Sequence, residues 1–439
     1  MPHVRADRLM RVLMIAMQYP TAAGQSYLTT ELADALAMSG HDVEVLHLDW
    51  GAAPDLKIEK IRTQTGVSVT RCGPKCVSSF GALVRNASKF VLSGRRAAKV
   101  AELYFDLSKF DAAIAWMPAL AIAPLARKLA RAQIRHRLLF IWDFFPDHHH
   151  EIGRIPSGLP LRIARAWEQR LLGRFTAIIC TLPGNADYLR RRFGVRADQR
   201  VLVTPIWGDP TPVPPVDRAA VRRTYGLPAQ APIAVFGGQL VEGRGFEQML
   251  AAADAALAAG SDLSFLFVGD GRFAASISER ASRQANVLYR PALSRDDFLE
   301  LLGACDVGMV ATVPGVTSFS IPSKSIDYLR AGLPIIAAVE HGNDFVQILN
   351  RYGVGAAVPF GEGELFFLEA ERLASGGPIK ARAAHCLEEI FDVRHALATV
   401  LDAAGEGPAT RRTEVPSNPR QPRKRSAERA LRHSPSKAG

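Results

Sequence analysis

The sequence predicts an α/β protein built from two doubly wound, Rossmann-like domains that face each other across a cleft. From residue 11 onward, short β-rich runs alternate with amphipathic helical stretches, the pattern stops at a proline-rich stretch, and it then begins again. Alternating strands and helices are typical of a parallel sheet covered by helices. The chain has 439 residues, which is enough for two such domains.

The first series opens with a strand at 11–16, a helix at 29–39 and a strand at 43–48. Apolar residues recur at helical spacing within the helix, and Gly40 ends it. Further strands are expected at 67–71, 112–115, 137–142, 177–181 and 201–205. We therefore assign residues 1–207 to a first domain, which we expect to bind the acceptor.

Residues 208–216 contain four prolines and are expected to form a linker. The second series has strands at 233–236, 263–268, 287–290, 307–311 and 334–338, with a helix at 246–259. It defines a second domain at 217–404, whose last helix we expect to return to the first domain. Residues 405–439 are rich in Arg, Lys, Ser and Pro, a composition that cannot bury a core, so we expect a disordered basic tail.

The formal net charge of +11 suits an anionic partner such as a nucleoside diphosphate, an anionic membrane surface or a nucleic acid. A nucleic-acid-binding protein would need a basic patch with exposed aromatic residues or a known binding module, and neither is recognisable. No apolar run is long enough to span a bilayer, and the first apolar run indicates a strand rather than a signal peptide. We expect a cytoplasmic protein without a specific nucleic-acid partner.

Ligands of doubly wound sheets bind at the carboxyl ends of strands and at helix N-termini. Gly238 and Gln239 follow the strand at 233–236, and Arg244 lies shortly after them. Paired glycines allow backbone to approach a ligand, and an arginine binds phosphate bidentately. Gly269 and Asp270 follow the strand at 263–268 and are expected to face the base or ribose of a nucleotide. An ordinary turn remains open for each segment.

A third segment is the most specific. Ser323 and Lys324 lie where a helix is expected to begin, a combination that favours binding of a diphosphate. Asp327 follows one turn later and is expected to accept hydrogen bonds from ribose hydroxyls. In the first domain, Gly24 and Gln25 follow the first strand and would present backbone amides to a phosphate. That loop is not G-x-G-x-x-G, so a dinucleotide cofactor is not expected.

In this order the segments resemble the family-four glycosyltransferases of the GT-B fold, and most closely their bacterial surface-polysaccharide branch. Residues 322–336 are similar to that branch's Pro-Ser-Lys, acidic-Tyr-Leu and Ala-Gly-x-Pro signature, and residues 142–147 are similar to its Asp-Leu-Trp-Pro-Glu segment. The resemblance covers about residues 10–400. It implies a retaining transferase, hexosyl or N-acetylhexosaminyl in type, that uses a UDP- or GDP-type sugar, no metal and no further cofactor.

The sequence departs from the family at two positions. The first of two family glutamates corresponds to Phe319, and the second corresponds to Asp327. One of the family's two phosphate-site cations corresponds to Gln239 and the other to Arg244. Lys324 is expected to supply the missing charge, so that Arg244 and Lys324 stabilise the departing diphosphate.

Acceptor-side candidates lie in the first domain. Asp143 follows a strand and would bind the acceptor or take its proton. His148, His149 and His150 come next, and three adjacent histidines cannot all face one metal ion in regular structure. We expect a solvated loop here, with His148 and His149 as candidates for contact with the acceptor or for its base.

Residues 80–105 interleave apolar and basic side chains at roughly helical spacing, with Gly94 as a break. Such a stretch would rest on an anionic inner leaflet, which suits a glycan or polyprenyl-linked saccharide as acceptor. A core-facing helix with a solvated basic face is the alternative. For the whole chain, an inactive GT-B scaffold and a nucleotide-sugar 2-epimerase remain as alternatives, although no epimerase signature is found.

Overall fold

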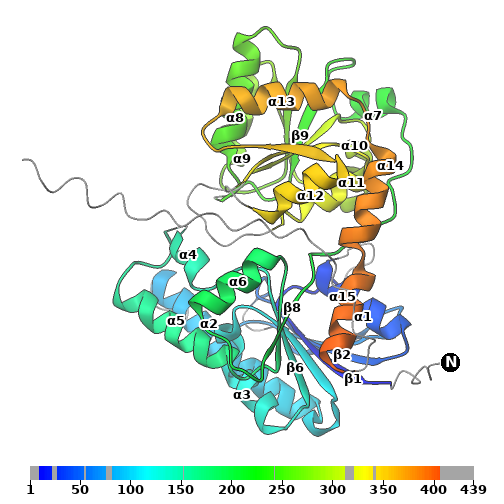
Figure 1. Ribbon diagram of the computed structural model, residues 1–439. Coiled ribbons are helices and arrows are strands. Elements are labelled where there is room, and N and C mark those ends of the chain that lie inside the picture. The colour runs from blue at the N-terminus through cyan, green and yellow to red at the C-terminus, as the bar shows by residue number, and fades with distance from the viewer. Residues whose placement is uncertain are drawn as a thin grey trace, which may run out of the picture.

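The computed structural model describes residues 9–21, 27–53, 56–75, 82–151, 153–241, 243–311, 321–339 and 343–405, with backbone alone for 82–87 and 90. It contains two α/β domains, one above the other in Figure 1, each with a largely parallel sheet between helices. The predicted fold class is confirmed.

The first domain has eight strands in the order β3-β4-β2-β1-β5-β6-β7-β8. All neighbours are parallel except β3 and β4, which pair antiparallel. The strands are β1 (Arg11–Ala16), β2 (Asp42–Leu48), β3 (Glu59–Arg62), β4 (Ser68–Cys72), β5 (Ala112–Trp116), β6 (His136–Ile141), β7 (Ala177–Cys180) and β8 (Arg200–Val203). Chain order reverses between β1 and β5, which is where ligands of such sheets bind.

Helices cover both faces of this sheet. They are α1 (Leu28–Met38), α2 (Ala82–Tyr104), α3 (Ala123–Arg131), α4 (Asp147–Glu151), α5 (Leu159–Leu172) and α6 (Pro183–Arg192), with the short turns η1 (Leu107–Lys109) and η2 (Ala119–Ile122). Among the described residues, no helix is both long and apolar enough to cross a membrane.

The expectation that Gly94 breaks the helix at 80–105 is wrong, because α2 continues through it. A Cβ at Gly94 would lie 2.6 Å from the carbonyl oxygen of Ala121 in η2. The glycine therefore allows α2 to approach η2 closely, which is a packing role rather than a helix-breaking one.

The second domain has six parallel strands in the order β11-β10-β9-β12-β13-β14. The strands are β9 (Ile233–Gly237), β10 (Ser264–Val268), β11 (Val287–Arg290), β12 (Val307–Ala311), β13 (Ile335–Ala338) and β14 (Gly355–Val358). The helices are α7 (Arg218–Thr224), α8 (Phe246–Ala258), α9 (Ala274–Arg283), α10 (Arg295–Leu302), α11 (Lys324–Arg330), α12 (Asp344–Tyr352), α13 (Gly363–Ser375), α14 (Lys380–Cys386) and α15 (Val393–Ala403). Here chain order reverses between β9 and β12.

The chain crosses between the domains twice. The linker leads upward from β8, and α14 and α15 run back down the side of the molecule (Figure 1). α15 contacts α1, β8 and β6 of the first domain, and Arg200 forms an ion pair with Asp402 over 2.9 Å. The backbone N–H of Gly208 donates to the carbonyl oxygen of Phe391 over 2.9 Å, which joins the two crossings.

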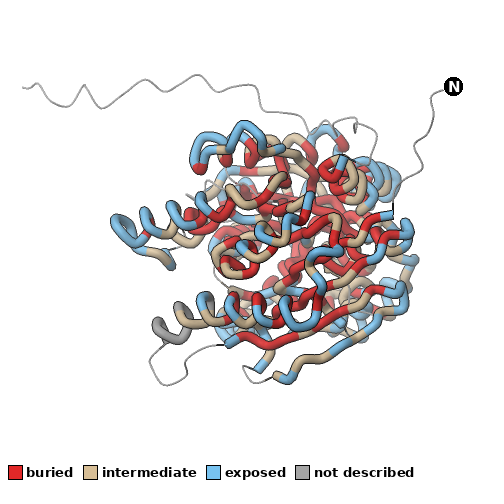
Figure 2. Tube along the Cα trace, turned by 90° about the horizontal axis from the view of Figure 1, so that it is seen from below, coloured by how far each residue is buried: buried red, intermediate tan, exposed pale blue. Residues whose placement is uncertain are grey.

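Buried residues concentrate along the strands and on the inward faces of the helices (Figure 2). All five residues of β5, β9, β10 and β12 are buried, as expected for parallel strands covered on both faces.

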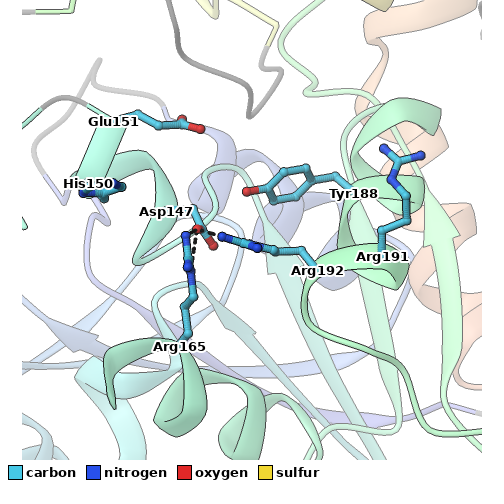
Figure 3. A pocket seen from close by; sticks show the side chains of 7 residues that line it. All are labelled: Asp147, His150, Glu151, Arg165, Tyr188, Arg191 and Arg192. Atoms are coloured by element: carbon cyan, nitrogen blue, oxygen red, sulfur yellow. Dashed lines mark hydrogen bonds and ion pairs between the residues drawn. The ribbon is translucent and has the colours of Figure 1, made fainter. Parts of the chain in front are cut away.

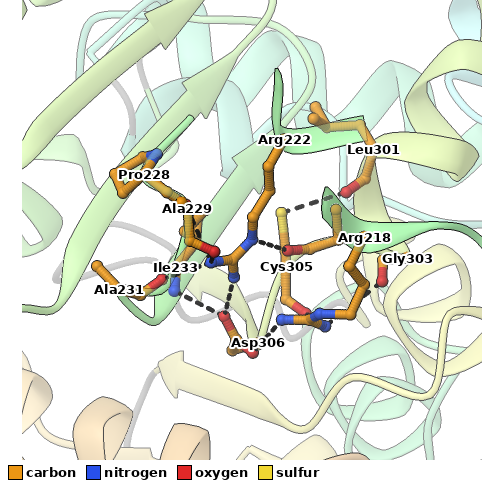
Figure 4. Close-up of polar contacts among 11 residues, drawn as sticks. Arg218, Arg222, Pro228, Ala229, Ala231, Ile233, Leu301, Gly303, Cys305 and Asp306 are labelled. Atoms are coloured by element: carbon orange, nitrogen blue, oxygen red, sulfur yellow. Dashed lines mark hydrogen bonds and ion pairs between the residues drawn. The ribbon is translucent and has the colours of Figure 1, made fainter. Parts of the chain in front are cut away.

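A buried ion pair anchors α7 at the amino ends of β9 and β12 (Figure 4). Arg222 donates to Asp306 over 2.9 Å and also to the carbonyl oxygens of Ala304, Pro228, Ala229 and Ala231. The same Asp306 oxygen accepts the N–H of Ile233, the first residue of β9. This network lies at the opposite end of the sheet from the predicted donor site and therefore serves the fold.

Candidate functional site

Two glycine turns meet at the carboxyl ends of β9 and β10. Gly238 and Gly269 have φ values of +127° and +146°, a region that favours glycine. A Cβ at Gly269 would lie 1.8 Å from the carbonyl oxygen of Gly238. The backbone N–H of Leu240 donates to the carbonyl oxygen of Asp270 over 2.9 Å. The two turns can therefore pack this closely only because glycine occupies these positions.

Lys324, the first residue of α11, lies beside these turns. Its Nζ is 4.3 Å from the centre of the Phe236 ring, near the end of β9. A Cβ added at Gly238 would lie 3.7 Å from Cε and 4.0 Å from Nζ of Lys324. Burial lowers the pKa of Lys324 to about 7, and the positive charge of Arg244 acts in the same direction. The structure therefore brings Lys324, Gly238 and Arg244 to one place.

Arg244 lies in the loop between β9 and α8, flanked by Gly243 and Gly245 with φ values of +80° and +61°. Its side chain is exposed. Among the described residues, neither Arg244 nor Lys324 forms an ion pair with a carboxylate. Two cations that repel each other and have no acidic partner favour an anion between them.

The other predicted donor residues have different surroundings. Asp327 is bound by Arg295 of α10 over 2.8 Å and 3.3 Å, so its carboxylate already has a partner that would compete with a ribose. Ser323 is exposed at the start of α11 and makes no capping hydrogen bond through its side chain. Gln239 and Asp270 are exposed, and Asp270 bonds to the hydroxyl of Tyr289.

The first domain contributes a tyrosine that the sequence did not reveal. Tyr27 is the residue before α1, and burial raises its pKa to about 12. The negative charge of Asp143 acts in the same direction, and the positive charge of Arg244 opposes it. A charge from each domain thus acts on the hydroxyl of Tyr27.

The three histidines lie in α4, so the expectation of a solvated loop is wrong. His148 and His149 are half-buried, and the rings of His149 and Phe145 are 5.2 Å apart. Burial lowers the pKa of His149, helped by His148 and Arg154 and opposed by Asp143. A histidine that stays neutral near pH 7 retains a nitrogen that can accept a proton.

Aromatic side chains form a layer beneath Tyr27 and Asp143. Trp142 contacts the rings of Tyr27, Trp116 and Trp207 at centroid distances of 5.9 Å, 5.8 Å and 6.2 Å. The indole N–H of Trp207 donates to the carbonyl oxygen of Leu28 over 2.8 Å and so fixes the start of α1. The sequence pointed to this aromatic layer only through Trp142, which follows β6. Tyr27, Trp116 and Trp207 are distant from it along the chain.

A pocket of about 350 Å³ lies between α4, α5 and α6 (Figure 3). Asp147 is buried at its base and forms ion pairs with Arg165 and Arg192, the latter over 3.5 Å. Its Oδ2 has no hydrogen-bond partner among the described residues. The lining mixes acidic and basic groups, which suits a polar ligand with both hydroxyl and anionic groups.

Gly24, Gln25 and Phe319 lie outside the described residues. Within the described ranges, no group of three or more His, Cys, Asp and Glu side chains is placed to hold a metal ion. The second domain thus offers glycine turns and two convergent cations, and the first domain offers a carboxylate and a histidine of lowered pKa. This arrangement is suited to stabilising an anionic leaving group beside a polar nucleophile.

Comparison with known proteins finds similarity to glycosyltransferases. Residues 23–207 match the glycosyl transferase 4-like domain. The chain is 25% identical over 373 residues to a putative colanic acid biosynthesis glycosyl transferase of Escherichia coli K12, covering 80% of this chain and 88% of that protein. It is 27% identical over 136 residues to a GDP-mannose-dependent monoacylated phosphatidylinositol monomannoside mannosyltransferase of Corynebacterium glutamicum, covering 30% of this chain and 36% of that protein.

Two solved structures share the fold. Sucrose-phosphate synthase of Thermosynechococcus elongatus superposes with a TM-score of 0.65 at 16% identity, covering 90% of this chain and 98% of the other. Anabaena HepE in complex with UDP superposes with a TM-score of 0.64 at 15% identity, covering 90% of this chain and 100% of the other. Together with the two facing domains, these likenesses show a glycosyltransferase of the GT-B type whose residues 23–207 match the glycosyl transferase 4-like domain.

Proposed function

We propose that this glycosyltransferase moves a hexosyl or N-acetylhexosaminyl group, with retention of configuration, from a UDP- or GDP-type sugar to a glycan or polyprenyl-linked saccharide in cell-surface polysaccharide synthesis. The observation that carries the proposal is the convergence of Arg244 and Lys324 at the carboxyl end of β9, where no carboxylate of the described residues pairs with either of them. A diphosphate supplies the negative charge that this pair lacks.

Loss of the diphosphate from the donor builds negative charge on the leaving oxygen. In the proposed reaction, Arg244 and protonated Lys324 stabilise that charge, and no divalent cation is needed. The depressed pKa of Lys324 matters here, because a bound diphosphate favours its charged form. Gly238 and Gly269 let the backbone come close to the ligand.

On the acceptor side, we assign Asp143 and His149 to binding the acceptor hydroxyl and taking its proton. The negative charge of Asp143 acts on both Tyr27 and His149, and burial lowers the pKa of His149. His148 adjoins them with its ring centre 6.1 Å from that of His149. We assign no separate nucleophile.

The choice of donor and acceptor rests on the relatives. One is named for colanic acid biosynthesis, one for GDP-mannose dependence, and one was solved with UDP. We further propose that residues 80–105 contact the inner leaflet. Within α2, Val91 is exposed and so are Arg95 and Lys99, a combination that suits an anionic surface.

The first test is thermal unfolding of the purified protein with UDP, GDP, ADP, dTDP and CMP, and then with their sugars, with and without EDTA. One diphosphate should raise Tm, and Arg244→Ala or Lys324→Ala should abolish the shift. Arg283→Ala, an exposed arginine of α9, is the control and should keep it. A shift that requires a divalent cation would overturn the metal-independent mechanism.

Retention is tested separately by NMR of the product made from the identified donor sugar. A product with the donor's anomeric configuration supports the proposal, and an inverted product contradicts it. Absence of binding by every nucleotide and nucleotide sugar would favour an inactive scaffold, which is motivated by Gln239 at the family's cation position.

A further inference from the structure

An unusual row of apolar side chains lies on the outer face of α5. Leu159, Ile163 and Trp167 are 67%, 42% and 54% exposed. They are spaced four residues apart, so they adjoin one another along the helix. Large apolar side chains gathered in this way on a surface mark an interaction site more often than isolated ones do.

The charges on this face have one sign. Arg162 and Arg170 are exposed beside the apolar row, and α5 has a single acidic residue, Glu168. Glu168 is buried, and it accepts the backbone N–H groups of Ala119 and Leu120 over 2.6 Å and 2.9 Å. The outer face of α5, by which we mean Leu159, Arg162, Ile163, Trp167 and Arg170, is therefore apolar and basic.

The packing of α5 keeps this face outward. Leu161, Leu171 and Leu172 are buried in the first domain, and Glu168 fixes the helix to η2. Turning Trp167 inward would expose these leucines and remove both hydrogen bonds of Glu168. The exposed row is thus a fixed feature of the folded domain rather than a side-chain fluctuation.

The neighbouring helix continues the same character. α2 and α5 both contact η2, and the two helices lie on the same side of the first domain (Figure 1). Val91 of α2 is 51% exposed, with Arg95 and Lys99 exposed one and two turns further along. Apolar and basic side chains exposed on two helices that both contact η2 match an extended anionic plane better than a small ligand.

We propose that the outer face of α5 docks on an anionic lipid surface, with Trp167 among the head groups and Arg162 and Arg170 on lipid phosphates. Tryptophan favours the membrane interface, and basic residues near an anionic leaflet add to the attraction. The inference deepens the proposed function, because a polyprenyl-linked acceptor resides in such a surface. It assigns docking to α5 in addition to residues 80–105.

The fluorescence of Trp167 reports directly on contact with lipid, because Trp167 is exposed and the other four tryptophans are not. Trp116 and Trp207 are buried, and Trp50 and Trp142 are half-buried. The full chain is mixed with phosphatidylcholine vesicles, with or without a third of phosphatidylglycerol. We expect sedimentation with the anionic vesicles and a blue shift of the emission that Trp167→Phe removes. Ile163→Asp and the double variant Arg162→Gln/Arg170→Gln should each weaken binding on the order of tenfold.

Leu257→Asp is the matched control, since Leu257 is 52% exposed on α8 of the second domain and should leave vesicle binding unchanged. Binding that disappears on removal of residues 406–439 but survives Ile163→Asp would assign docking to the tail and overturn the proposal. The proposal would also be overturned if the protein forms a dimer without lipid and Ile163→Asp dissociates that dimer. The α5 variants should keep the nucleotide-induced rise in Tm, and Arg244→Ala should keep vesicle binding, so failure of either proposal is recognised separately.

Discussion

The backbone N–H of Gly184, at the start of α6 in the first domain, donates to Oδ2 of Asp344, at the start of α12 in the second domain, over 2.9 Å. Asp344 is buried, and burial raises its pKa. The contact joins the domains at a point distant in sequence from the linker and from α15. It is therefore placed to stabilise their observed arrangement.

We predict that Asp344→Ala shifts the protein toward a more open arrangement. A hydrogen bond to a charged acceptor contributes about 1.5–3 kcal/mol, which corresponds to a change in population of roughly tenfold to a hundredfold. Small-angle scattering should show a larger radius of gyration. Asp344→Asn keeps an acceptor oxygen and should produce a smaller change. Identical scattering curves for the alanine variant and the parent protein would contradict the prediction.

Binding of a nucleoside diphosphate should weaken as pH rises through about 7. In the free protein, the pKa of Lys324 is lowered to about 7, so this side chain is charged below that pH and neutral above it. A bound diphosphate favours the charged form, so binding above pH 7 requires proton uptake, and affinity falls by up to about tenfold per pH unit. Calorimetric titration across this range measures the effect.

Lys324→Arg is the matched variant for this experiment, because an arginine stays charged throughout the range. Its affinity should vary much less with pH, whereas Lys324→Met should bind weakly at every pH. The same pH dependence in Lys324→Arg and in the parent protein would assign the titration to another group.

Gly269→Ala should destabilise the second domain and abolish nucleotide binding. The added Cβ would lie 1.8 Å from the carbonyl oxygen of Gly238, and the φ of +146° disfavours any side chain. The cost should be on the order of 2–4 kcal/mol, since both strain and overpacking contribute. Chemical denaturation measures it.

Gly377→Ala is the control for backbone strain alone. Gly377 also has a positive φ, +71°, but no atom lies within 4 Å of its added Cβ. We expect a cost of about 1 kcal/mol or less and normal nucleotide binding. Equal costs for the two variants would show that the close approach of the two turns contributes nothing.

Arg222→Met should lower the free energy of unfolding by about 3–5 kcal/mol, because it removes one of the two arginines that pair with Asp306 and the donor of four carbonyl oxygens. Arg283→Met removes an exposed i,i+4 pair with Glu279 and should cost less than about 1 kcal/mol. Denaturant unfolding of both variants provides the comparison. A small cost for Arg222→Met would show that water replaces the lost contacts.

Most strands and helices were predicted from the spacing of apolar residues along the chain. Strands such as β1 and β10 are buried on both faces, so they appear as continuous apolar runs, and helices such as α8 follow at the expected place. The edge strand β3 escaped the analysis, because its four residues are half exposed and carry no such run. Gly94 was misread for a related reason, since local propensity carries no information about the approach of η2.

The sequence by itself determined the two α/β series, the linker between them and the turns that carry Gly238, Gly269 and Lys324. These depend on local periodicity and on residues that neighbour one another along the chain. Only the tertiary structure decided that Lys324 and Arg244 meet with no acidic partner among the described residues, and that Arg295 binds Asp327. It also decided that Asp143 and Arg244 both act on the pKa of Tyr27. The physical reason is that charge and burial depend on distances between residues that are far apart in sequence, and packing of the sheets and domains sets those distances.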